Sequence, residues 1–219
     1  MKLLLWKDYR LNRFVLIIAA ILLVCPVVIA GAGVVWVDFP YHPDSGDLHR
    51  SVWIGTEIGL GLSVLSLCLL GGNSFAAERI DGSADFLATL PPTRFTVLSS
   101  KLMLASLTCV LIAAFVYATR FAVNVATGLS ESHGYPVNWA LCCTGFGVSW
   151  LSSVVVDSPT YAVGLGLLGV FFVPLSVGAM RAAGFLAISN PIGNTVFGIA
   201  LGTSAVIAGC MLYQRKEKP

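Results

Sequence analysis

The chain has 219 residues, of which 57% are hydrophobic and only 11% are charged, with a net charge of +2. Soluble domains carry about a quarter charged residues, so this composition and a mean hydropathy of +0.85 exclude an ordinary soluble domain. The apolar residues form blocks of about 20 residues, the length at which a helix spans a bilayer. These blocks lack the alternation of barrel strands, so we expect an all-α, polytopic helical membrane protein.

Six apolar blocks predict about six transmembrane helices in a single domain that covers residues 1–219. Only Asp157-Ser158-Pro159 separates the fourth block from the fifth. A charge beside a proline makes a good hairpin turn, because proline ends one helix and opens the next. The predicted spans are 14–36, 52–75, 97–122, 137–156, 160–180 and 192–213.

Residues 1–13, which precede the first block, are expected to form an interfacial helix. Apolar and aromatic residues such as Trp6 and Tyr9 alternate there with basic residues. Such a helix lays its apolar side chains into the headgroup region while its cations meet anionic lipid; a plain basic flank is the alternative. The uncharged run from Phe14 to Val37 is longer than the roughly 7–15 residues of a signal-peptide core, so we expect a retained helix.

Two features of the second block concern helix packing. Gly55 and Gly59 form a small-xxx-small pattern, which lets helices approach closely and predicts tight packing or dimerisation. Glu57 lies in the same block, and Arg120 lies near the outer end of the third, at similar depth if the two spans are antiparallel. Intramembrane charges usually face protein or a water-filled cavity, so an intramembrane pair of Glu57 and Arg120 is a candidate substrate or gating contact. The alternative is that Arg120 snorkels to the interface.

The chain shows no pattern of catalytic or metal-binding residues. His42, Asp44, Asp47 and His49 share an outer loop, but their spacing fits no established ligand pattern, so we expect no metal site. The ATP-binding motif G-x-x-x-x-G-K-[ST] is absent, as are H-E-x-x-H and G-x-S-x-G. We therefore expect a chain that is not an enzyme and has no catalytic residues.

The basic residues predict the orientation, because lysine and arginine are enriched on the cytoplasmic side of membrane proteins. If the N-terminus is inside, only Arg50, Arg120 and Arg181 of the 13 basic residues fall at the outer side. We therefore expect both termini in the cytoplasm and the chain in the plasma (inner) membrane. The ten basic residues on the inner side are Lys2, Lys7, Arg10, Arg13, Arg79, Arg94, Lys101, Arg215, Lys216 and Lys218.

The polar stretch from Glu78 to Lys101 connects the second and third spans and, in this orientation, lies in the cytoplasm. Asp and Ser side chains near residue 82 can cap a helix N-terminus, so residues 84–90 are predicted to form a short helix that Pro91-Pro92 ends. A charged, partly helical connector is a natural docking surface for a soluble partner. The alternative is a solvated loop whose charges keep it in water.

The order of residues in this connector resembles the signature of ABC-2 type transporter permeases. That pattern is an acid, then Gly-[Ser/Thr], a leucine-rich helix, Leu-Pro-x-[Ser/Thr]-Arg and a lysine. The six-span count and the opening LLLWKDYRLNR also agree with the family, although about thirty residues carry the specific match. The matching landmarks are Glu78, Gly82-Ser83, Phe86-Leu87, Leu90-Pro91, Thr93-Arg94 and Lys101.

The resemblance implies the membrane-spanning permease subunit of an ABC transporter, exporting an unknown hydrophobic or amphipathic substrate. Its partners would be a separate ATP-binding subunit, a second permease copy or related permease, and the lipid bilayer, with no nucleic acid. This chain would bind no cofactor, since ATP and Mg would be held by the partner subunit. The connector over 76–96 would dock on that subunit through Glu78, Arg79, Gly82, Asp85, Phe86, Leu90, Pro91 and Arg94.

Three other functions fit parts of the sequence. A haem-exporter-type permease of cytochrome c maturation has a similar length and span count. A non-transporting membrane assembly or regulatory subunit could bind an ATPase without forming a pathway, and ATP-dependent substrate flux would distinguish it from a permease. A membrane-embedded enzyme is the third, but the spans lack polar catalytic constellations.

Overall fold

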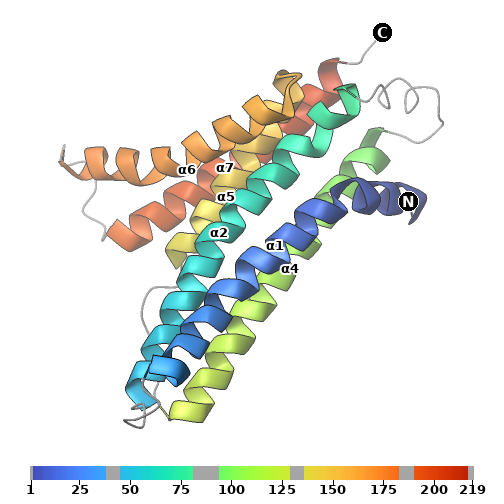
Figure 1. Cartoon of the computed structure of the whole chain (residues 1–219). Helices are drawn as coiled ribbons and strands as arrows, with labels where there is room; N and C mark the ends of the chain where they lie inside the picture. Colours follow the sequence, from blue (N-terminus) through green and yellow to red (C-terminus); the bar gives the residue numbers. More distant parts are fainter. Residues whose placement is uncertain (1, 38–44, 81–93, 129–135, 183–189, 217–219) are drawn as a thin grey trace.

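The computed structural model describes residues 2–37, 45–80, 94–128, 136–182 and 190–216, which form six helices (Figure 1). Four of these helices, α1, α2, α4 and α7, are long and apolar enough to cross a membrane, while α5 and α6 contain shorter apolar stretches. The prediction of an all-α, polytopic membrane protein is therefore confirmed. The helices are α1 (Lys2–Val37), α2 (Ser45–Ile80), α4 (Arg94–Thr127), α5 (Pro136–Val155), α6 (Pro159–Ala182) and α7 (Asn190–Lys216).

Each predicted span coincides with one helix, and most of the helices extend beyond their apolar blocks. Residues 2–13 are helical and continue directly into the first span within α1, and these first turns bend away from the rest of the helix (Figure 1); their interfacial position stays a prediction. Helix α2 begins at Ser45 rather than near residue 52. Hydropathy marks where a chain leaves the hydrocarbon layer, whereas backbone hydrogen bonds can continue the helix into polar surroundings.

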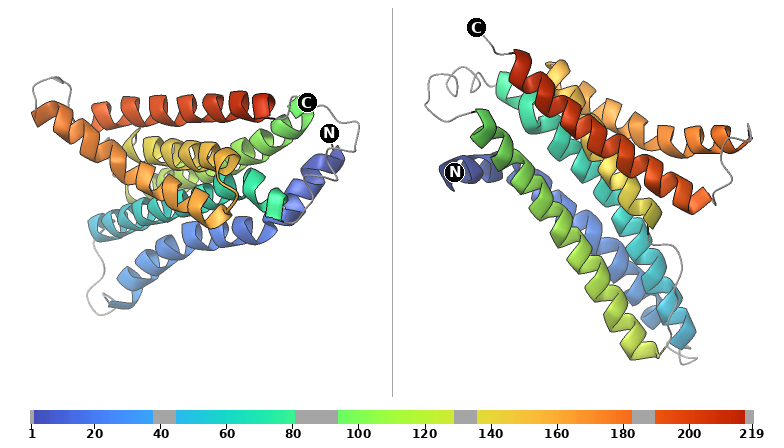
Figure 2. Two further views of the ribbon diagram at one scale, coloured as in Figure 1. Left: turned by 90° about the horizontal axis from the view of Figure 1, so that it is seen from above. Right: turned by 180° about the vertical axis from the view of Figure 1, so that it is seen from behind.

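Helix α2 is the central element of the fold. It packs against α1, α4, α5 and α6, and 61% of its apolar stretch is buried, compared with 11% for α1. Figure 2 shows α1 and α4 together on one side of α2, with α5, α6 and α7 together on the other. The two helix groups are therefore joined mainly through α2.

The outward faces of the helices carry large apolar side chains, including Phe14 of α1, Phe121 of α4 and Phe171 of α6. Exposed apolar surface on this scale is rare on soluble monomers, whereas lipid is a suitable environment for it. The packed interior is formed around Leu67 of α2 and Trp150 of α5, both fully buried. This distribution is that of a bundle surrounded by lipid.

Glycines set the closest helix contacts. Carbonyl oxygens of α1 lie beside Gly55 and Gly59, where an added Cβ would come within 2.8 Å of the Pro26 oxygen and 2.7 Å of the Leu23 oxygen. The small-xxx-small pattern of α2 therefore serves packing within the chain. In the α5–α7 contact, a Cβ added to Gly202 would lie 2.4 Å from the carbonyl oxygen of Cys143. Only glycine allows these backbones to approach so closely.

Replacing Gly202 by alanine should destabilise the protein, because the new Cβ forces α5 and α7 apart. Overpacking of this kind costs about 1–3 kcal/mol. Gly61 of α2 provides a matched control, since an added Cβ there meets nothing within 4 Å and alanine favours a helix by about 0.5–1 kcal/mol over glycine. Thermal unfolding in detergent should show a lower midpoint for Gly202→Ala and an equal or higher one for Gly61→Ala. Equal midpoints for the two variants would contradict this packing.

Candidate functional site

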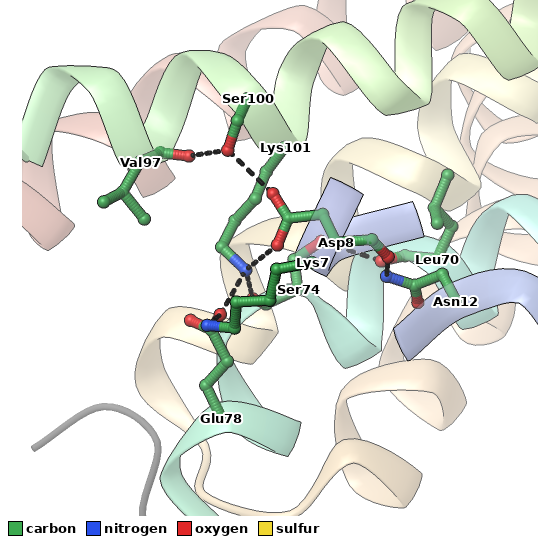
Figure 3. Close-up of polar contacts among 9 residues, drawn as sticks. All are labelled: Lys7, Asp8, Asn12, Leu70, Ser74, Glu78, Val97, Ser100 and Lys101. Atoms are coloured by element: carbon green, nitrogen blue, oxygen red, sulfur yellow. Dashed lines mark hydrogen bonds and ion pairs between the residues drawn. The ribbon is translucent and has the colours of Figure 1, made fainter. Parts of the chain in front are cut away.

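A buried ion pair joins the two helices, α2 and α4, that flank residues 81–93. Glu78 lies in the last turn of α2 and Lys101 lies near the start of α4, with Lys101 Nζ 3.1 Å from Glu78 Oε1. Their side chains are only 7% and 6% exposed. Figure 3 shows the two residues facing each other at the point where α2 and α4 meet. The end of α2 and the first turns of α4 are therefore held together by opposite charges.

Two residues from the first turns of α1 complete this arrangement. Lys7 Nζ lies 2.8 Å from Glu78 Oε1, and Asp8 Oδ1 lies 3.6 Å from Lys101 Nζ. Ser100 Oγ donates a hydrogen bond of 2.7 Å to Asp8 Oδ2 (Figure 3). We call Lys7, Asp8, Glu78 and Lys101 the inner charge cluster. It contains two acids and two bases, and it joins α1, α2 and α4.

Lys101 is the most enclosed cation of the inner charge cluster. An ammonium group has three donors, and here Asp8, Glu78 and the carbonyl oxygen of Ser74 surround it. Burying an ion costs several kcal/mol in lost hydration, so the burial of Lys101 is tolerable only while these partners stay in place. The inner charge cluster therefore fixes the mutual position of three helices. Its net contribution to the free energy of folding is small, because the ion pairs offset the cost of burying the charges.

Arg79 points away from the inner charge cluster, toward the end of α5. Its Nη1 donates to the carbonyl oxygen of Val154 at 3.2 Å, and its Nη2 donates to the carbonyl oxygens of Ser153 and, at 2.6 Å, of Val156. Its Nε lies 3.1 Å from Asp157 Oδ1. The last carbonyls of a helix lack intrahelical partners and carry partial negative charge, so a guanidinium suits this position.

The other predicted coupling residues fall outside the part of the chain just described. Gly82, Asp85, Phe86, Leu90 and Pro91 lie in the 81–93 connector, outside the described residues, as does the expected short helix over 84–90. Arg94 begins α4, but its side chain is likewise not described. The docking role of these residues stays a prediction. Glu78 and Arg79 were expected to contact a partner, and the structure places both side chains against helices of their own chain.

The opposite end of the α2–α4 contact holds a second ion pair. Arg120 of α4 donates from Nη2 to Glu57 Oε1 of α2, and its guanidinium carbon lies 4.2 Å from the ring centroid of Trp53. The Arg120 side chain is 5% exposed, whereas that of Glu57 is 36% exposed. Arg120 is therefore buried between the two helices, with its guanidinium paired to Glu57. Glu57 is the half-open member of the pair.

A histidine contact that the sequence did not indicate lies beside this pair. His49 Nε2 is 3.0 Å from Asn124 Oδ1 of α4, and the His49 ring is buried beside Trp53. The sequence placed His49 in a loop, because the apolar block begins later than the helix. The spacing of His49, Trp53 and Glu57, each four residues apart, was the available signal, since such residues share one helix face.

Every buried charged side chain of the described residues lies in an ion pair between helices: Asp8, Glu78, Lys101 and Arg120. The buried charges of this chain therefore show one thing directly, that paired side chains join its helices.

Comparison of the chain with models of protein families, with curated proteins and with solved structures found no match.

Removing Lys101 should destabilise the protein far more than removing Lys7. Lys101→Met leaves two buried carboxylates without their shared cation, and loss of one partner of a buried pair costs about 3–5 kcal/mol. Lys7 is about one-third exposed, and Glu78 keeps Lys101 when Lys7 is lost, so Lys7→Met should cost about 1 kcal/mol or less. Denaturant unfolding of both variants in mixed micelles measures the difference. Similar losses would show that the inner charge cluster is not organised around Lys101.

The Glu57–Arg120 pair should give a non-additive double-mutant cycle. Glu57→Gln leaves a buried guanidinium without its counter-charge, and the double variant with Arg120→Met removes that unpaired charge. The loss of unfolding free energy in the double variant should therefore be smaller than the sum of the single losses by about 1 kcal/mol or more. The same unfolding assay tests this expectation. Losses that simply add would mean that the two side chains do not interact.

Proposed function

We propose that this chain is the permease subunit of an ABC-2 type transporter. It couples ATP hydrolysis by a separate ATP-binding subunit to export of a hydrophobic or amphipathic substrate. The observation that carries the proposal is the position of the helix ends that flank the permease-like sequence 81–93. Helix α2 ends and α4 begins at the end of the bundle where α1 begins and α7 ends (Figure 1), and the basic residues near these helix ends indicate the cytoplasm.

The contacts at the connector ends support a coupling role. Glu78 and Lys101 are buried and paired across the α2–α4 contact, so a displacement of the connector would move α2 and α4 together. Binding of nucleotide to the partner would favour one position of the connector, and the helices would follow as a shift between two populations. ATP and Mg belong to the partner in this proposal, and the chain itself is not an enzyme.

The surface of α2 supports the presence of a second permease copy or a related permease. Although α2 is the central helix, Ile54, Ile58 and Leu62 on its half nearest Ser45 are exposed. A second chain at this face would place an apolar wall beside the half-open Glu57, as a pathway for an amphipathic substrate requires. The assembly would lie in the plasma (inner) membrane.

The docking function can be tested by co-purification from gently solubilised membranes. The variant Asp85→Lys/Phe86→Asp changes the connector and keeps all four residues of the inner charge cluster. Aromatic residues often dominate the energy of an interface, so the variant should recover at least about tenfold less ATP-binding subunit than the wild type, a difference of about 1.4 kcal/mol. Arg50→Ala removes an exposed charge near the opposite end of α2 and should recover as much as the wild type.

Two results would contradict the proposal. If the folded, abundant wild type recovers no ATP-binding protein, the chain is not a permease of this class. If the connector variant recovers as much as the wild type, the connector is not the docking surface. A recovered complex should then move a fluorescent phospholipid across liposomes in an ATP-dependent manner. A complex without such flux would indicate an assembly or regulatory subunit.

A further inference from the structure

The last turn of α2, directly before the connector, contacts both helix groups. Glu78 faces α1 and α4, while the next residue, Arg79, faces the hairpin of α5 and α6. Successive residues of a helix point about 100° apart, so one turn can hold partners on two sides. A displacement of Ile80, where α2 ends, would therefore act on the contacts of both Glu78 and Arg79.

We propose that Arg79 is a positioning residue that links the connector to the α5–α6 hairpin. Through Arg79, a displacement of the connector moves α5 and α6 together with α2, while the inner charge cluster carries α1 and α4. The inference rests on the proposed function. It adds a link from the connector to α5 and α6, which the residue order of the connector does not specify.

The chemistry of the contact explains why an arginine is needed. Helix α5 ends at Val155, and Pro159 at the start of α6 has no N–H group to continue the hydrogen-bond ladder. Arg79 supplies donors to the carbonyl oxygens of Ser153, Val154 and Val156 and also pairs with Asp157. A planar guanidinium presents five donors in a rigid fork. A lysine ammonium at the same place would be a single point charge and could satisfy fewer of these oxygens.

Close packing near Arg79 makes the link stiff. Gly72 lies two turns earlier in α2, and a Cβ added there would lie 3.0 Å from the backbone nitrogen of Val163 and 3.3 Å from the carbonyl oxygen of Pro159. The first turn of α6 thus lies directly on the α2 backbone. With Arg79 holding the end of α5 and Gly72 in contact with the start of α6, the hairpin is fixed to α2 from both of its helices.

The link can be tested on the chain alone by electron–electron distance measurements in lipid nanodiscs. Spin labels at positions 95 and 161, whose native Phe and Tyr are 70% and 71% exposed, report the hairpin position relative to α4 after the six native cysteines are replaced. Arg79→Ala should broaden the distance distribution at least about twofold, and Arg79→Lys should have an intermediate effect. Arg10→Ala, the loss of an exposed arginine in α1, should leave the distribution unchanged. An unchanged distribution in Arg79→Ala would overturn the link.

A purely structural cap would give the same broadening, so a second measurement uses the complex with the co-purified ATP-binding subunit. A non-hydrolysable ATP analogue with Mg should leave the 95–161 distance of the wild type unchanged, because both helix groups move with α2. Arg79→Ala should keep the subunit but show a shifted distance, because α4 then moves without the hairpin. A shift in the wild type, or an unchanged distance in Arg79→Ala, would overturn the coupling role. If the wild type recovers no ATP-binding subunit, the proposed function fails, and the measurement on the chain alone still decides whether Arg79 holds the hairpin.

Discussion

Burial of the Lys101 ammonium group requires Asp8 and Glu78 within ion-pair distance, and this requirement determines how α1, α2 and α4 meet. An unpaired buried charge costs several kcal/mol. A rotation or translation of any of the three helices would separate the Lys101 ammonium group from its partners and is therefore unfavourable. The same turn of α2 provides Arg79, which satisfies the carbonyl groups at the end of α5. The positions of α1, α2, α4 and the end of α5 thus depend on charges that must stay paired.

Two kinds of contact make α2 the axis of the molecule. Ion pairs and the His49–Asn124 contact join α2 to α4 near both ends, while glycines bring the α2 backbone close to α1, α5 and α6 between them. Packed interiors respond to a force as blocks, with little continuous deformation. A helix held in this way is suited to transmitting movement from a partner bound at its end.

Hydropathy alone predicted the six helices and the turn before Pro159, because lipid tolerates a long apolar run only as a helix. The Glu57–Arg120 contact could be anticipated, since neighbouring antiparallel spans fix the depth of each charge. Asp8 and His49 were not recognised as partners of α4. Their pairing depends on the rotation of helices and on helical turns beyond the apolar blocks, neither of which hydropathy encodes. The direction of Arg79 depends on where α5 ends in space, which its own sequence neighbourhood does not indicate.

The proposed function requires that the 81–93 connector contact an ATP-binding subunit in intact cells. A photoreactive amino acid at position 86, irradiated in intact cells, tests this contact without solubilisation, and position 50 near the opposite end of α2 serves as the comparison. The account predicts a covalent adduct with an ATP-binding protein from position 86 and none from position 50. An abundant, folded chain that gives no such adduct from position 86, or the same adduct from both positions, would contradict it.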